Sequence, residues 1–216
     1  MAVQKDLANL DFYLKQLQPN QKLLAVSKLQ PIDKIQKLYQ QGQTHFAENY
    51  VQEALEKIEA LKNLNIHWHL IGPLQKNKVK YLKNHFSYIH SVDSYELAEL
   101  ISKKSIENNF RQKIMIQVNF SNEASKSGFG ESDFEQQWPR LSDLPGIEIC
   151  GLMTMPPLQN DPEENRIYFK KCYQLGQKYQ LKEYSMGTSH DYQIALQEGA
   201  TWIRLGTLLF GERLLQ

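Results

Sequence analysis

Eight apolar runs of strand length recur along the chain, and longer segments of helical period separate them. The runs are KLLAVS (22–27), THFAE (44–48), IHWHLIG (66–72), YIHSV (88–92), KIMIQVNF (113–120), IEICGLM (147–153), EYSMG (183–187) and TWIRLG (201–206). Strands that alternate with helices pair in parallel, because each crossover has to return across the sheet. Eight such units in 216 residues fit a closed barrel better than an open sheet.

We therefore predict an α/β fold, a single (β/α)8 barrel domain over residues 1–216, with an extra helix over 3–17. The clearest helical patterns between the runs cover 31–42, 50–63, 94–109 and 162–180. In the last of these, Ile167, Cys172 and Leu175 recur at roughly helical spacing, which predicts one buried face.

Composition narrows the class of protein. The 25 Lys and Arg residues nearly balance 24 Asp and Glu residues, which argues against a dedicated nucleic-acid binder. The charged N-terminal segment excludes a signal peptide, and no apolar stretch approaches the length of a membrane span. The chain has two cysteines, Cys150 and Cys172, which are too few to stabilise a protein of this size through disulfide bonds. We therefore expect reduced thiols and a cytoplasmic location. No exposed apolar stripe demands a partner, and we expect a monomer.

Polar residues collect where the predicted strands end, which is the working face of such a barrel. Lys28 follows the first run, and Asn49 follows the second. A lysine at a strand end usually extends its amine to water. At this rim, beside the last strand of the closed barrel, a partly desolvated amine has a lowered pKa and can attack an aldehyde.

The last two turns, SMGTS (185–189) and RLGT (204–207), combine glycines with hydroxyl groups. Glycine lets the backbone approach an anion, and hydroxyls and amide N–H groups bind phosphate oxygens. Tight turns that simply need small residues are the alternative. A phosphate site is common at this place in the fold. Together with Lys28 and the interior Arg204, it suggests pyridoxal 5'-phosphate (PLP).

Seven segments, taken in order, resemble the YggS/PROSC family of PLP homeostasis proteins. They are LLAVSK, FAENYVQEALEKI, IHWHLIGPLQKNK, IHSVDS, NEASKSGF, GLMTMP and YSMGTSHDYQIALQEGATWIRLGTLLFGER. The resemblance extends from about residue 20 to residue 213. It implies a barrel like the N-terminal domain of alanine racemase.

The resemblance also implies a PLP site in which Lys28 holds the cofactor as a Schiff base and Arg204 faces the pyridine nitrogen. The complete set that we expect at the cofactor is Lys28, Asn49, His69, Ser185, Met186, Gly187, Ser189, Arg204, Gly206 and Thr207. Of these, Ser185, Gly206 and Thr207 are implied to hold the phosphate, and Asn49 to lie near the phenolic oxygen.

Two departures from the family stand out. Ala47 replaces the usual glycine, and GTSHD replaces the commoner GMSDD, which introduces Thr188 and His190.

Arg204 bears on the choice between carrier and enzyme. Arginine is always charged, so it opposes protonation of the ring and weakens the ring as an electron sink. A racemase with arginine there still needs a second acid/base, which alanine racemase takes from a separate C-terminal domain of the partner subunit. The chain ends at Gln216 without such a domain. We expect binding and delivery to PLP-dependent apo-enzymes, without substantial catalysis.

Two alternatives stay open. One is a PLP-dependent enzyme of racemase type with low activity. The other is a barrel enzyme acting on another phosphorylated metabolite, with Lys28 as base or nucleophile.

Three further signals carry weaker predictions. His67 and His69 share one strand face, but no third ligand is evident, so we expect structural or pocket-lining histidines and no metal. The lysine-rich segment 75–84 is typical of a solvated helix face. The polar loop 121–129 favours a flexible flap beside the pocket, and Lys126 within it has no evident role.

Overall fold

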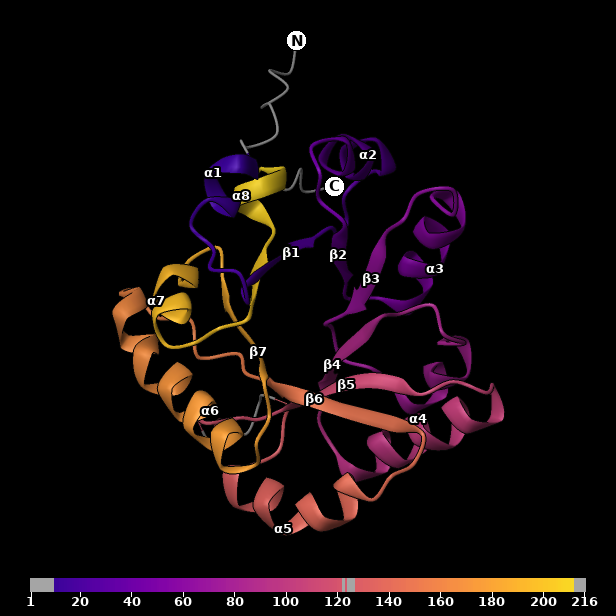
Figure 1. Ribbon diagram of the computed structural model, residues 1–216, viewed down its shortest axis with the longest axis vertical. Coiled ribbons are helices and arrows are strands. Elements are labelled where there is room, and N and C mark those ends of the chain that lie inside the picture. Colours follow the sequence, from indigo (N-terminus) through magenta and orange to yellow (C-terminus); the bar gives the residue numbers. More distant parts are fainter. Residues whose placement is uncertain (1–9, 122, 124–126, 212–216) are drawn as a thin grey trace.

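Eight parallel strands close into a barrel in the computed structural model of the protein, which describes residues 10–121, 123 and 127–211 (Figure 1). The strands are β1 (Lys22–Val26), β2 (His45–Glu48), β3 (His67–Leu70), β4 (Tyr88–Val92), β5 (Gln112–Gln117), β6 (Ile147–Met153), β7 (Glu183–Thr188) and β8 (Trp202–Leu205). Each pairs with the next, and β8 closes on β1 with Leu24 opposite Arg204. The predicted fold class and all eight predicted strands are confirmed.

Helices form a ring outside the barrel (Figure 1). They are α1 (Leu10–Leu14), α2 (Ile32–Gln40), α3 (Val51–Ala60), α4 (Tyr95–Glu107), α5 (Glu131–Ser142), α6 (Arg166–Lys178), α7 (Tyr192–Gln197) and α8 (Thr207–Phe210), with 3-10 turns η1 (Lys76–Tyr81) and η2 (Pro162–Asn165). Of the predicted helix 3–17, the structure describes the part from residue 10, where α1 lies. The lysine-rich segment 75–84 forms η1 and the turn after it rather than a longer helix.

The predicted buried face of residues 162–180 is wrong at one position. Ile167 is 57% exposed, whereas Cys172 and Leu175 are buried. Ile167 lies five residues before Cys172, which turns it about 140° around a helix of 3.6 residues per turn. Phe169, three residues before Cys172, takes the buried place instead.

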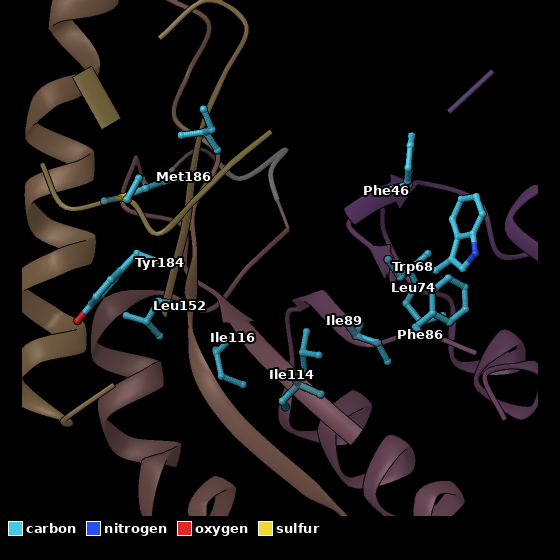
Figure 2. Packing of buried hydrophobic residues seen from close by; sticks show 14 of the residues in the cluster. Phe46, Trp68, Leu74, Phe86, Ile89, Ile114, Ile116, Leu152, Tyr184 and Met186 are labelled. Carbon is cyan, nitrogen blue, oxygen red and sulfur yellow. The ribbon is translucent and has the colours of Figure 1, made fainter. Parts of the chain in front are cut away.

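The core has two layers, because successive strand residues point to opposite faces of the barrel wall. The outer layer packs against the helices. Figure 2 shows part of it, with Ile114, Ile116, Leu152, Tyr184 and Met186 among the labelled residues. Tyr184 of β7 reaches α6, where Gln177 Nε2 donates a hydrogen bond to its hydroxyl at 2.9 Å.

The inner layer fills the barrel with Leu24, Ala47, Tyr88, Met115, Met153 and Trp202. The barrel is open at the carboxyl ends of the strands, where the pocket described below lies. Cys150 packs against this layer, Cys172 is buried in the outer one, and both are free thiols. Burial raises the pKa of each thiol to about 12. None of the described helices is long and apolar enough to span a membrane.

Candidate cofactor-binding site

A pocket of about 580 Å³ opens at the carboxyl ends of the strands. Its lining comes from the ends of β1, β2, β3, β5, β6, β7 and β8 and the turns that follow them. Six of the ten predicted site residues line it: Lys28, Asn49, Ser189, Arg204, Gly206 and Thr207. Thr188 and His190, the two departures from the family pattern, line it as well.

Lys28 is half-buried and lies in a turn. The backbone groups of the residues before and after it are hydrogen-bonded to α3. On one side, Lys57 Nζ donates a hydrogen bond to the Ser27 carbonyl oxygen at 2.7 Å. On the other side, the Leu29 N–H donates to Glu53 Oε1 at 2.6 Å. Leu29 has a φ of 59°, a left-handed conformation that costs a leucine about 1–2 kcal/mol. The two bonds therefore hold a turn that the local sequence does not favour.

The groups that hold this turn form one cluster, which we call the anchor cluster: Ser27, Glu48 and Lys57, which are buried, and Glu53, which is partly exposed. Lys57 Nζ lies 2.8 Å from Glu48 Oε1 and 2.7 Å from Glu53 Oε1. Ser27 Oγ donates to Glu48 Oε1 at 2.6 Å. Burial raises the pKa of Glu48, and the bonds from Lys57 and Ser27 oppose that rise. The anchor cluster ties β1, β2 and α3 together directly beside Lys28.

Asn49 presents a buried acceptor to the site. Its Oδ1 atom has no hydrogen-bond partner within the described part of the chain. Gly72 packs directly against it, since a Cβ at position 72 would lie 2.3 Å from the Asn49 carbonyl oxygen. A buried oxygen without a donor is uncommon in folded proteins. Beside a pocket, it is the kind of atom that a bound ligand would satisfy.

Arg204 brings a positive charge to the pocket wall while being only 4% exposed. Its Nη1 donates to Ser185 Oγ at 2.8 Å, and its Nη2 donates to the Thr154 carbonyl oxygen at 3.0 Å. Nη2 also lies 2.9 Å from Met155 Sδ. Burial lowers the pKa of Arg204 to about 10, which still leaves the guanidinium charged at neutral pH.

The turns after β7 and β8 meet at the pocket. Gly187 has a φ of 87°, in the region that favours glycine. The N–H and Oγ1 of Thr188 both donate to Asp191 Oδ1, at 2.7 and 3.0 Å, so this hydroxyl is engaged within its own turn. The Gly206 N–H donates to Ser189 Oγ at 3.3 Å and joins the two turns. The small residues of these two turns, after β7 and before α8, form a surface suited to an anion.

The other four predicted site residues do not line the pocket. Met186 packs in the outer core layer, and a Cβ at Gly187 would lie 2.5 Å from Ala195 Cβ of α7. Ser185 lies below the pocket, bonded to Arg204 and to His90. His69 is buried deeper in the barrel, between His90 and His45.

Sequence reasoning missed the anchor cluster and two of the interior histidines. His45 and His90 fall on the same inward-facing alternation as His69, on the neighbouring strands, and that pattern could have revealed them. His67, the other half of the predicted pair, is exposed and stacks on His45 with ring centroids 4.8 Å apart. Among the described residues, no group of three His, Cys, Asp or Glu side chains is placed to hold a metal ion.

Comparison with known proteins supplies the family. The family model for the alanine racemase N-terminal domain matches residues 5–214. A pyridoxal phosphate homeostasis protein of Aquifex aeolicus is 44% identical over 198 residues, which cover 89% of this chain and 87% of that protein. A protein of the same name from Synechocystis is 40% identical over 205 residues, covering 92% of this chain and 94% of that protein.

Solved structures agree. PipY of Synechococcus elongatus, solved with PLP bound, is 39% identical with a TM-score of 0.88 and covers 94% of this chain and 98% of its own. Without PLP its TM-score is 0.90 at 40% identity, with the same coverage. An alanine racemase of Clostridium difficile, 14% identical with a TM-score of 0.74, shares the fold over 96% of this chain and 56% of its own. The chain therefore belongs to the alanine racemase N-terminal domain family, among the pyridoxal phosphate homeostasis proteins.

Proposed function

We propose that this protein binds PLP in the pocket, holds it covalently through Lys28, and serves PLP homeostasis and delivery rather than turnover. The observation that carries the proposal is the meeting, in one pocket, of a half-buried lysine, a buried arginine and two glycine-containing turns. The names of the relatives and the PLP bound to PipY support it.

The residues present fit the cofactor. The pocket volume of about 580 Å³ lies within the usual range for small-molecule sites, roughly 300–1,000 Å³. When bound, PLP supplies an aldehyde that condenses with a primary amine, with loss of water, and a phosphate group. Lys28 is the amine in the pocket, and Ser189, Gly206 and Thr207 line the part suited to the phosphate. Within the described part of the chain no group donates to Asn49 Oδ1, and such an acceptor suits a ligand hydroxyl.

Arg204 supports a carrier rather than an enzyme. Among the described residues that line the pocket, those with ionisable side chains are Lys28, His190 and Arg204. Arg204 is held as a charged donor by Ser185 and Thr154, and such a group beside a pyridine nitrogen opposes its protonation. Proton transfer would therefore depend on Lys28 and His190.

A second candidate function is weak racemase-type activity, and the presence of His190 in the pocket lining favours it. Its ring Nε2 lies 3.1 Å from the Gln159 carbonyl oxygen, at the exposed edge of the pocket. Incubation with L-alanine tests this candidate. Negligible change in optical rotation supports the carrier, whereas measurable racemisation that is lost in both Lys28→Ala and His190→Gln supports the enzyme.

An absorption spectrum of the purified protein tests the cofactor itself. We expect a near-visible band that sodium borohydride removes, leaving the cofactor fixed to a peptide containing Lys28. Lys28→Ala should lose the band, and Lys37→Ala, at a half-exposed lysine of α2, should keep it. A protein without the band, even after incubation with PLP, would instead point to a barrel enzyme acting on another phosphorylated metabolite.

Delivery has its own test. Apo-enzymes that depend on PLP should regain activity when mixed with the loaded protein, faster than with the same amount of free PLP in the presence of a scavenging phosphatase. Equal rates would contradict a delivery role while leaving PLP binding intact.

A further inference from the structure

Four side chains connect Arg204 to the opposite end of the barrel through its interior. Ser185 Oγ lies 2.8 Å from Arg204 Nη1 and 2.8 Å from His90 Nδ1. His90 Nε2 lies 2.9 Å from His69 Nδ1. His69 Nε2 in turn lies 3.0 Å from His45 Nδ1. We call Ser185, His90, His69 and His45 the histidine relay.

The relay is closed to water over most of its length. Ser185, His90 and His69 are each 0% exposed, and they come from the third positions of β7, β4 and β3. His45 is half-buried and begins β2, so the relay ends at the amino-terminal end of the barrel. Its bonds must therefore be satisfied among these side chains themselves.

The chemistry of the groups fixes the direction of the bond between Ser185 and His90. Arginine can only donate, so Ser185 Oγ accepts from Arg204. If His90 also donated to Ser185, the single hydroxyl hydrogen of the serine would need another acceptor. In the described part of the chain, Ser185 Oγ makes no hydrogen bond besides those to Arg204 and His90. Ser185 therefore donates to His90 Nδ1.

The direction then propagates along the relay. His90 accepts at Nδ1, so it is neutral with its hydrogen on Nε2, and it donates to His69 Nδ1. By the same reasoning His69 donates from Nε2 to His45 Nδ1. Burial favours these neutral rings, since it lowers the pKa of His90 to about 3, that of His45 to about 4 and that of His69 well below 6.5.

We propose that the histidine relay is a positioning device for Arg204, whose neutral, aligned rings hold the guanidinium charged and aimed at the pocket. In this direction the acceptor side of each ring faces the arginine, so the dipoles of the relay stabilise a positive charge that burial disfavours. The use of that charge for the cofactor rests on the proposed function. The relay itself does not, because its hydrogen bonds join only side chains of the protein.

Charged, titratable and aromatic side chains surround His45 and His69, toward the amino-terminal end of the barrel. His67 stacks on His45, and the positive charge of Lys22 disfavours protonation of His45. Tyr88 stacks on His69 at 5.1 Å, and Trp202 packs against His69 at 4.8 Å. Glu183 is occupied by the Tyr88 hydroxyl at 2.9 Å and by the Trp202 indole N–H. The Glu183 carboxylate thus bonds to these two aromatic side chains.

Nitrogen-15 NMR of the histidine side chains tests the relay directly in the ligand-free protein. We expect His45, His69 and His90 to carry hydrogen on Nε2 and a bare Nδ1, unchanged from about pH 8 to about pH 5.5. The exposed His85 provides a reference signal from a ring outside the relay. A hydrogen on Nδ1 of any of the three, or protonation of His90 within that range, would overturn the proposal.

Two substitutions at His90 test the effect on Arg204. His90→Asn keeps an acceptor near the position of Nδ1, whereas His90→Leu keeps the volume without the acceptor. We expect His90→Leu to shift the guanidinium nitrogen signals of Arg204 and to weaken PLP binding about tenfold, as loss of a buried hydrogen bond would. His90→Asn should recover most of both effects. A purely structural role predicts equal loss of stability in the two variants and an unchanged Arg204 signal.

The outcomes separate this proposal from the proposed function. If the wild type fails to bind PLP, the proposed function fails, and the NMR result still decides the relay. If the wild type binds PLP and His90→Leu folds, binds equally tightly and keeps the Arg204 signal, the relay proposal fails alone. If His90→Leu does not fold, Ser185→Ala and Ser185→Thr provide the same comparison at the next position of the relay.

Discussion

Lys57 shows how much the placement of Lys28 depends on residues that do not line the pocket. Its side chain is 7% exposed and faces two carboxylates, Glu48 and Glu53, while its third bond goes to the backbone next to Lys28. A buried ion pair adds little stability compared with an apolar pair, but removing one partner leaves an uncompensated charge. The anchor cluster should therefore be sensitive to a change at Lys57.

We expect Lys57→Met to lower the free energy of unfolding by about 3 kcal/mol, because it leaves Glu48 buried beside an apolar chain. Urea denaturation measures the change. Lys62→Met is the matched control, since Lys62 pairs with Glu59 on the protein surface and its loss should leave stability nearly unchanged. Equal effects in both variants would contradict a special role for the anchor cluster.

Gly72 provides a second prediction at the scale of one residue. A Cβ at this position would lie 2.3 Å from the Asn49 carbonyl oxygen and 2.7 Å from Asn49 Cβ, so Gly72→Ala should displace Asn49 from the pocket. We expect PLP binding to weaken about tenfold or more, measured by equilibrium titration. Gly42→Ala, with a φ of 100° but nothing within 4 Å, should lower stability without changing PLP affinity.

At the scale of elements, the inner faces of β2, β3 and β4 place three histidines where charge is disfavoured. Their pKa values lie below the ordinary value of 6.5, so unfolding takes up protons when the pH is below it. Their contribution to stability is complete above about pH 6.5 and is lost as the pH falls toward the folded pKa values. Glu48, whose pKa is raised, acts in the opposite direction.

We therefore expect the free energy of unfolding to fall between about pH 6.5 and 4.5, by up to about 1.4 kcal/mol per pH unit for each fully buried histidine. The half-buried His45 should contribute less. Urea denaturation at a series of pH values measures the slope. His90→Asn should make the slope shallower, and His85→Gln, at an exposed ring, should leave it unchanged. Identical slopes in His90→Asn and the wild type would show that His90 is already charged when folded.

At the scale of the whole molecule, the pocket is lined by residues from the ends of seven strands, so a bound ligand should stabilise the entire barrel. No domain covers the pocket within the described residues. A ligand that binds the folded state alone adds about 2.7 kcal/mol at 100 times its dissociation constant. We expect PLP to raise the melting temperature of the wild type, and to raise that of Lys28→Ala much less. A similar shift in both proteins would show that the covalent bond contributes little to retention.

The oligomeric state also belongs to this scale. We predict a monomer, and sedimentation velocity over a wide range of concentration should give one species of the mass of a single 25.2 kDa chain. A concentration-dependent dimer would contradict the prediction.

The sequence by itself determined the barrel and the rim of its pocket. Strand alternation and turn residues are local signals, so all eight strands could be placed from the residues within each run. Lys28 and Asn49 follow from where the first two runs end, and Arg204 lies within the last run. The buried face of α6 could not be placed as safely, since Ile167 is apolar but lies on the wrong side of the helix.

Tertiary structure alone decided what holds the pocket residues in place. The bond between Ser185 and His90 joins residues 95 positions apart, and the bond from Lys57 to Ser27 joins residues 30 apart. Such contacts exist only once the barrel has closed and brought distant strands side by side. The spacing of polar residues along the sequence does not show which of them will form hydrogen bonds with each other inside the fold. The physical reason is that a hydrogen bond depends on geometry in space, whereas hydrophobic alternation is written along the chain.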